Sequence, residues 1–151
     1  MNNLKSTLDA DLILAMKSKD SIKVTALKNL KSEITKIEKS TQFIGKELTD
    51  SDYINIIKKV YNQRMESYKI YTDSNRSDLA EPEIKEAEIL KVYLPEKISE
   101  EKLVEFITTL IKENDYKGNK SMGIVISETI SNFGDGADKK DISRIAKNLL
   151  N

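Results

Sequence analysis

The sequence predicts an all-α protein, and three features of the chain support this class. Apolar residues recur three and four positions apart, which places their side chains on one face of a helix. Only five glycines and two prolines interrupt the 151 residues. No segment alternates apolar and polar residues as a half-buried strand would. A chain of this length can bury one hydrophobic core and a smaller second core. We expect about four helices in residues 1–95 and three in residues 96–151.

The first two helices are expected at about residues 3–17 and 20–39. The inner side of the first contains Leu4, Leu8, Leu12 and Ala15 or Met16. Asp20 is a suitable N-cap for the second. The apolar arc of this second helix consists of Val24, Leu27, Leu30, Ile34 and Ile37. Lys23 falls inside that arc, at 100° per residue, whereas Lys28, Lys31 and Lys39 lie to one side of it.

The third helix should begin at Asp50, because Thr49 and Asp52 have the spacing of a capping box, and should reach about Thr72. Its apolar stripe is Tyr53, Ile57, Val60, Tyr61, Tyr68 and Tyr71. A fourth helix follows a loop at residues 72–76. Its inward residues are expected to be Leu79, Ala80, Ile84, Ala87, Leu90 and Leu94. Pro82 is tolerable in the first turn of this helix and would otherwise kink it.

Tyr93, Leu94 and Pro95 are expected to form an elbow between two domains, residues 1–95 and 96–151. Proline disfavours the helical conformation at the residue before it, so the fourth helix should end here. Ser99 can then cap a new helix that has acidic residues in its first turn, where the helix dipole favours anions. Because the spacer is only a few residues long, we expect it to fix the orientation of the two domains.

Three short helices should form the C-terminal domain. Their expected inward residues are Leu103, Phe106, Ile107, Leu110, Ile111, Met122, Val125, Ile126, Ile130, Phe133, Ile142, Ile145, Ala146, Leu149 and Leu150. The turn at residues 134–136, Gly-Asp-Gly, ends one helix, and Asp138 caps the next. This turn lacks the lysine of a phosphate loop and the ligand spacing of an EF-hand, so we interpret it as a helix stop.

Composition limits the chemistry available to the chain. There is no cysteine and no histidine, which excludes disulfides, thiolate chemistry and histidine-based triads; no metal site or cofactor is expected. The formal charge is zero, yet residues 1–47 contain nine lysines and six acidic residues, a net charge of +3. The N-terminal stretch has no apolar run that would suit a signal peptide or a membrane span. We therefore expect a soluble cytoplasmic protein with no membrane contact.

Arg64, Glu83 and Glu86 are the most distinctive polar residues, because helical spacing places them within or at the edge of apolar arcs. Buried charges are usually paired, so we favour a partly buried ion pair that links the third and fourth helices, joined by Lys23. The alternative is a polar cleft in which a glutamate of raised pKa acts as an acid or base. No second catalytic group is apparent, and we predict no catalytic residue.

Two further groups of residues have alternative interpretations. The lysines of the N-terminal third could form a phosphate-binding stripe, although a solvated helix face is the simpler explanation of them; they are Lys17, Lys19, Lys28, Lys31 and Lys39. No aromatic residues are interleaved for base stacking, which argues against single-strand recognition. Met122 and Gly123 open a helix after a flexible turn, and they are either core filler or a small exposed contact for a protein partner.

A series of short motifs resembles the YqeY family, the stand-alone relatives of the C-terminal region of the GatB subunit of tRNA-dependent amidotransferases. The motifs in order are Ala15-Met16-Lys17 with Asp20, Gln63-Arg64 with Ser67, Arg76 with Asp78-Leu79, Glu83 with Glu86, Tyr93-Leu94-Pro95, Ser99-Glu100-Glu101, Met122-Gly123 and Gly136-Ala137-Asp138. The resemblance covers essentially the whole chain. The chain departs from the family pattern at Lys23 and Lys28, where arginine is frequent, and at Pro82. Lysine lacks the bidentate fork of arginine.

The resemblance implies an N-terminal helical domain and a C-terminal three-helix domain similar to ubiquitin-associated modules. It also implies a tRNA-binding or amidotransferase-associated accessory protein, with amidotransferase or tRNA-synthetase components as further partners. The family-level label is carbon–nitrogen ligase activity with glutamine as amido-N-donor. The chain lacks recognisable ATP and glutaminase motifs, which argues against this activity for the chain alone. The alternative function is a protein-interaction module that acts through the C-terminal domain.

Overall fold

The structure, a computed structural model, describes residues 3–151, and these residues form helices connected by turns. The α-helices are α1 (Asn3–Lys17), α2 (Ser21–Glu38), α3 (Asp50–Asp73), α4 (Ser77–Lys91), α5 (Glu100–Asn114), α6 (Met122–Phe133) and α7 (Lys139–Leu150). Two short 3-10 helices, Asn119–Ser121 and Gly134–Gly136, flank α6. No strand occurs in the described part of the chain, so the predicted all-α class is confirmed. No described helix combines the length and apolarity that crossing a membrane requires.

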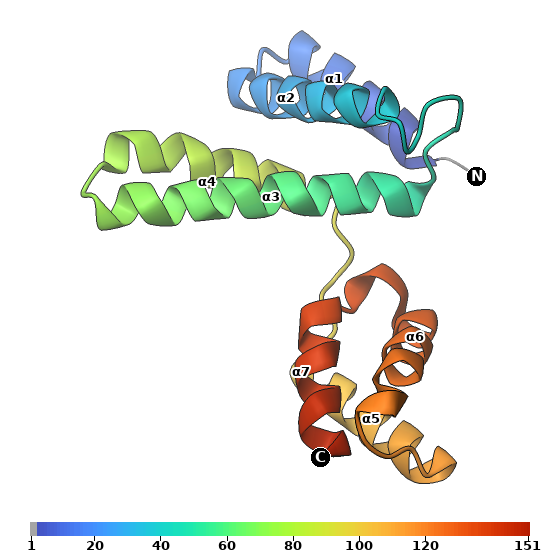
Figure 1. The fold of residues 1–151 in the computed structure, drawn as a ribbon. Helices are drawn as coiled ribbons and strands as arrows, with labels where there is room; N and C mark the ends of the chain where they lie inside the picture. Colours follow the sequence, from blue (N-terminus) through green and yellow to red (C-terminus); the bar gives the residue numbers. More distant parts are fainter. Residues whose placement is uncertain (1–2) are drawn as a thin grey trace. The chain divides into compact units, whose positions relative to one another are not determined.

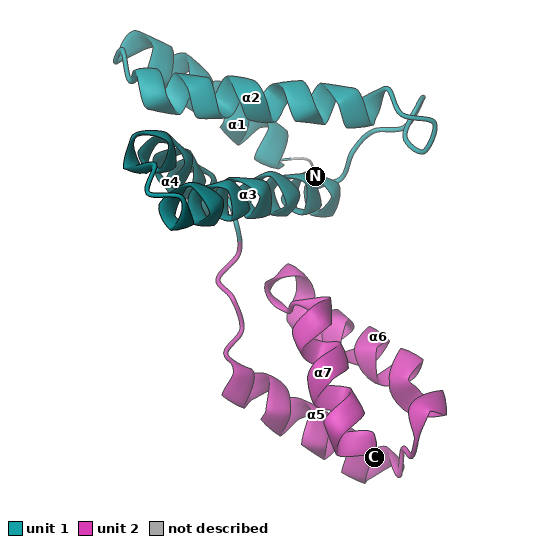
Figure 2. Cartoon of the chain, turned by 60° about the vertical axis from the view of Figure 1, so that its left-hand side comes forward, with its two compact units in different colours: residues 1–94 teal, residues 95–151 magenta. Residues whose placement is uncertain are grey.

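The chain divides into two compact units, Met1–Leu94 and Pro95–Asn151 (Figure 2). The first unit consists of two helical hairpins, α1–α2 and α3–α4, that stack on each other (Figure 1). Between them lies a core in which Leu27, Leu30, Ile57 and Leu90 are at most 1% exposed. From the predicted apolar stripes of α2, α3 and α4, this interface buries Leu27, Leu30, Ile34, Tyr53, Ile57, Val60 and Leu90.

Side-chain contacts of the capping residues fix the helix ends in both units. Thr49 and Asp52 form a reciprocal capping box at the start of α3. The side chains of Asp20, Ser99 and Asp138 accept backbone N–H groups at the starts of α2, α5 and α7. Each cap satisfies donors that have no partner within the helix. The sequence therefore determines these starts locally.

Of the two residues expected at the inner position of α1, Ala15 takes it and Met16 is 53% exposed. The inward position expected for Leu79 is wrong. Leu79 is 39% exposed, because the α3–α4 hairpin extends beyond the α1–α2 layer at its turn (Figure 1). Pro82 is the sixth residue of α4 rather than part of its first turn. The helix continues through it, and Pro82 itself is exposed.

The second unit packs α5, α6 and α7 around Leu103, Ile107, Val125 and Ile142. Phe106 and Phe133 add an edge-to-face contact with ring centroids 5.1 Å apart. The expected core is wrong at two positions, since Ile130 is 37% and Leu149 39% exposed.

Thr129 is fully buried in place of Ile130. Its hydroxyl donates to the carbonyl of Val125 at 2.7 Å, so the hydroxyl is satisfied inside the helix. A threonine can then occupy an apolar position, because burying a polar group is costly only when it lacks a partner. A prediction from apolar periodicity places isoleucine rather than threonine in the core, and it therefore missed the burial of Thr129.

The segment that follows Pro95 pairs with the turn between α6 and α7. The backbone N–H of Ile98 donates to the carbonyl of Gly136 at 3.0 Å. A Cβ atom added at Gly136 would lie 2.7 Å from the carbonyl oxygen of Glu96, which is a backbone atom. The approach of these two backbone segments therefore requires glycine at position 136.

We predict that Gly136→Ala lowers the stability of the second unit by about 1–3 kcal/mol, because overpacking forces a backbone shift. Thermal denaturation of the full chain, followed by circular dichroism, measures the change. Gly123→Ala is the matched control: nothing lies within 4 Å of its added Cβ, and alanine within a helix should be neutral or stabilising. Equal melting curves for Gly136→Ala and the unmodified chain would contradict the prediction.

Candidate functional site

Arg64 lies between two glutamates where α3 faces α4. Its Nη1 atom is 3.2 Å from Oε2 of Glu83, and its Nε atom is 3.2 Å from Oε2 of Glu86. The three side chains are 27%, 19% and 15% exposed, respectively. Lys23 is half-buried on α2, and no ion pair among the described residues joins it to this cluster. The hairpin thus brings together three of the four expected residues.

One guanidinium faces two carboxylates in this cluster, and Glu86 is the less well satisfied of the two. Its Oε2 atom is buried and accepts no hydrogen bond from the described residues, so the contact with Arg64 is electrostatic. Burial raises the pKa of Glu86, the Glu83 carboxylate raises it further, and Arg64 only partly offsets both effects. The group therefore binds a proton more readily than an exposed glutamate.

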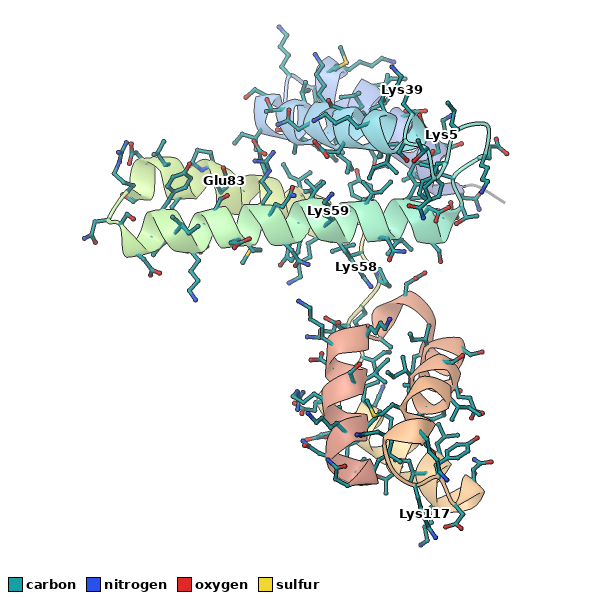
Figure 3. All side chains as sticks on the ribbon, in the orientation of Figure 1. Lys5, Lys39, Lys58, Lys59, Glu83 and Lys117 are labelled. Carbon is teal, nitrogen blue, oxygen red and sulfur yellow. The ribbon has the colours of Figure 1, made fainter. Side chains whose placement is uncertain are left out.

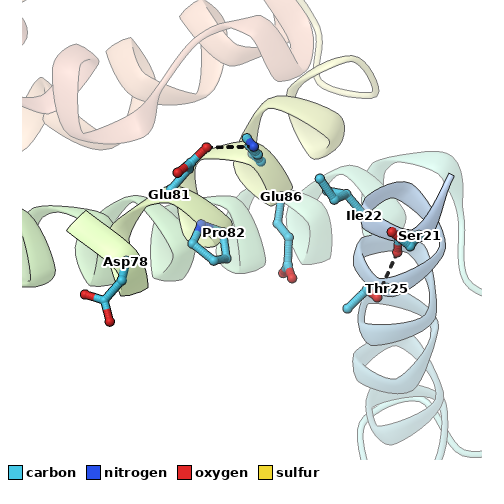
Figure 4. A pocket seen from close by; sticks show the side chains of 8 residues that line it. Ser21, Ile22, Thr25, Asp78, Glu81, Pro82 and Glu86 are labelled. Atoms are coloured by element: carbon cyan, nitrogen blue, oxygen red, sulfur yellow. Dashed lines mark hydrogen bonds and ion pairs between the residues drawn. The ribbon is translucent and has the colours of Figure 1, made fainter. Parts of the chain in front are cut away.

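A pocket of about 420 Å³ adjoins Glu86, between the start of α2 and the first half of α4. Its lining consists of Ser21, Ile22, Thr25, Asp78, Glu81, Pro82, Lys85 and Glu86 (Figure 4). Within it, Lys85 pairs with Glu81 at 2.7 Å, and the hydroxyl of Thr25 donates to the carbonyl of Ser21 at 2.9 Å. Asp78 and Glu86 instead pair with Arg76 and Arg64, which are not part of the lining. No cluster of acidic residues among those described could hold a metal ion.

All five lysines of the expected stripe are exposed on the α1–α2 hairpin. Lys17 ends α1, Lys19 lies in the following turn with a φ of 58°, and Lys39 caps the far end of α2. Lys31 differs from the others, because its Nζ atom is 2.7 Å from Oδ1 of Asp9.

These lysines are spread out rather than clustered. The 18 residues of α2 span about 27 Å at 1.5 Å per residue. Lys39 lies at the same end of the hairpin as Lys5 (Figure 3), whereas Lys17 and Lys19 lie at the opposite end. Exposed lysines are therefore distributed along the whole length of the hairpin.

The remaining predicted residues lie at the two sides of the unit boundary and on α6. Tyr93 and Leu94 pack against the core of the first unit, and the Tyr93 hydroxyl donates to Oδ2 of Asp11 at 2.5 Å. Burial and the Asp11 carboxylate both raise the pKa of Tyr93. The orienting role of the elbow, with Pro95, stays a prediction.

Sequence reasoning missed Asp11, because no local pattern links it to a tyrosine 82 positions away. On α6, Met122 is half-buried against the second core and Gly123 is exposed. Met122 therefore packs against the core with one part of its side chain and exposes the rest to solvent.

The sequence matches the family described as Yqey-like protein over residues 5–150. Relatives include the protein "Altered inheritance of mitochondria protein 41, mitochondrial" from three yeasts. The one from Clavispora lusitaniae is 33% identical over 83% of this chain and 73% of its own length. Those from Lachancea thermotolerans and Candida glabrata are 37% and 36% identical over 59% and 63% of this chain. The chain spans only 46% and 52% of the length of the latter two.

The names of these relatives contradict the predicted cytoplasmic location, since they point to mitochondria. The prediction depended on the absence of a leader-like run near the N-terminus. An absent signal in one sequence does not specify a compartment, and the prediction was wrong for this reason.

The Arg64 cluster generates a test by double-mutant cycle. Arg64→Ala and Glu83→Ala should each destabilise the first unit by about 1–3 kcal/mol. The first leaves two partly buried carboxylates without their cation, and the second removes the hydrogen bond from Arg64 Nη1 to Glu83. The double variant should lose less than the sum of the two. Thermal and urea denaturation of the four proteins measure the coupling.

Arg76→Ala is the control for this cycle. Arg76 pairs with Asp78 at 3.1 Å, but these side chains are 55% and 65% exposed, so its loss should leave the melting temperature nearly unchanged. Additive effects of Arg64→Ala and Glu83→Ala, with unchanged melting temperatures, would rule out a stabilising ion-pair cluster.

Proposed function

The chain belongs to the Yqey-like protein family, and from this premise we propose that it is a non-catalytic accessory protein that binds tRNA through the α1–α2 hairpin. Its partners on this proposal also include amidotransferase or tRNA-synthetase components. The proposal rests on the resemblance to the GatB C-terminal region and on one observation about charge. That observation is the line of exposed lysines along the hairpin.

Four lysines supply the positive charge for phosphate contacts. Lys17, Lys19, Lys28 and Lys39 are exposed, and no ion pair within the described residues involves them. Lys31 contributes less, because Asp9 already neutralises much of its charge. Extended cationic helix faces bind nucleic-acid backbones by counterion release and read little sequence. We therefore expect contact with the phosphates of the paired stems of tRNA rather than with unpaired bases.

The proposal predicts that tRNA binding weakens steeply with salt. Four phosphate contacts correspond to about a hundredfold loss of affinity between roughly 50 and 200 mM salt. Gel-shift titrations of total tRNA with micromolar protein at the two salt concentrations measure this change. Lys28→Glu combined with Lys39→Glu should weaken binding at low salt at least about tenfold and flatten the salt dependence.

Lys139→Glu combined with Lys140→Glu provides a control with the same change in charge. Both residues lie in the first turn of α7, where acidic residues are favourable, so the fold should tolerate the change. This variant should retain tRNA binding. If the unmodified chain does not shift tRNA at low salt, tRNA binding is excluded.

A second candidate function concerns the second unit, which we propose is a ubiquitin-associated-like module that contacts a protein partner. The supporting observation is the outward face of α6, which contains no charged side chain. Its residues are Gly123, Ile124, Ser127, Ile130 and Ser131. Glu128, the single charged residue of α6, accepts a hydrogen bond from the Tyr116 hydroxyl at 3.2 Å. An uncharged face of this kind is typical of protein contacts.

The second candidate is tested with the immobilised full chain. A partner captured from lysate should be lost with Ile124→Ser, because Ile124 is exposed on this face and its replacement leaves the core intact. Val92→Ser, an exposed apolar residue outside the second unit, should retain the partner. Loss with both variants or with neither would remove the support for an α6 contact.

A further inference from the structure

Helix α1 has apolar residues on two opposite sides, and the first unit covers one of them. The inner side, with Leu8 and Ala15, is buried against the core. The outer face of α1 consists of Ala10, Ile13, Leu14 and Met16, all exposed, the last three by 54%, 61% and 53%. Their spacing of three and four places them on adjoining turns of the helix. Exposed apolar side chains gathered on one face of a helix mark a contact surface for another molecule.

The unpaired charges beside this face are positive. Both acidic residues of α1 have partners within the unit: Asp9 pairs with Lys31 at 2.7 Å, and Asp11 accepts from Tyr93 at 2.5 Å. Lys5, near the start of α1, and Lys17 and Lys19, at and just after its end, are exposed. These three lysines take part in no ion pair among the described residues. The outer face is therefore an apolar strip with positive charge at each end.

We propose that the outer face of α1 binds an acidic amphipathic helix of a partner protein. Leucine-like side chains of that helix pack on Ile13, Leu14 and Met16, and its flanking carboxylates pair with the lysines at the two ends. Helix-on-helix docking of this type uses anchors spaced three and four residues apart. The apolar part of this surface lies outside the proposed tRNA surface, since apolar side chains gain nothing from contact with phosphates, but the two surfaces share Lys17 and Lys19.

Charge also argues against a second copy of the chain as the occupant. If two α1 helices packed antiparallel, Lys17 would face Lys5 of the other copy. If they packed parallel, Lys17 would face Lys17. Both arrangements place like charges together, which opposes association. An acidic partner satisfies the lysines in either direction.

The probe for this surface is a synthetic amphipathic peptide of 15 residues, the length of α1, with leucines three and four apart and glutamates on both flanks. We expect saturable binding to the full chain by fluorescence anisotropy. A scrambled peptide of the same composition and a peptide with lysine in place of glutamate should each bind at least about tenfold more weakly.

Ile13→Ser combined with Leu14→Ser should weaken binding of the acidic peptide at least about tenfold. Ile44→Ser combined with Val92→Ser removes two other apolar residues, which are 69% and 81% exposed, and should leave binding unchanged. Because Ile13 and Leu14 are exposed, circular dichroism should be unaltered. Their variant should still bind tRNA as the unmodified chain does, so failure of the tRNA proposal is distinguishable from failure of this one.

Lys17→Glu combined with Lys19→Glu supplies the charge test, and it should reverse the preference between the acidic and the basic peptide. Sedimentation with vesicles of anionic phospholipid is run in parallel. Binding to vesicles but not to the acidic peptide, lost with Ile13→Ser and Leu14→Ser, would assign the face to a membrane surface and overturn the proposal. Equal binding of the acidic, basic and scrambled peptides, or no binding of any, would also overturn it.

Discussion

The packing of the α1–α2 hairpin on the α3–α4 hairpin is the constraint on which the first unit depends. Leu27, Leu30, Ile57 and Leu90 lose nearly all contact with water in this interface, and burial of such side chains is the main favourable term in folding. The interface uses one side of each helix. The opposite sides, with the lysines of α2 and the outer face of α1, remain in contact with solvent and available for binding.

The Arg64 cluster occupies the boundary between this apolar interior and the adjoining pocket. Its charges lie where the helical arcs would otherwise be apolar, and their mutual pairing makes partial burial tolerable. The raised pKa of Glu86 follows from burial and from the neighbouring Glu83. Such a shift occurs in structural ion-pair networks as well as in active sites. The nearby hydroxyl of Thr25 is directed to a backbone carbonyl, so the geometry favours the structural interpretation.

The two proposed surfaces of the first unit differ in chemistry although they share one hairpin. The lysines of α2 offer spaced positive charge, which suits a phosphate backbone. The outer face of α1 offers apolar area with lysines only at its ends, which suits another helix. Lys17 and Lys19 lie close to both surfaces, and a tRNA and an acidic partner would therefore compete for the same charges. An accessory protein could couple the two ligands in this way.

The sequence by itself determined the features that depend on neighbours within one helical turn. Capping residues such as Thr49 and Ser99 fixed helix starts, Gly134 marked a helix stop, and the spacing of apolar residues gave the all-α class. Helix α4 ends at Lys91, ahead of the predicted stop at Pro95. The same local rules identified Arg64, Glu83 and Glu86 as charges on apolar arcs. The tertiary structure decided which apolar side of α1 is buried and placed Thr129 rather than Ile130 in the core. It also decided that Asp9 pairs with Lys31 and that Asp11 accepts the hydrogen bond of Tyr93. Periodicity specifies the faces of a helix, but the partner of each face lies tens of residues away and is selected only when the helices pack.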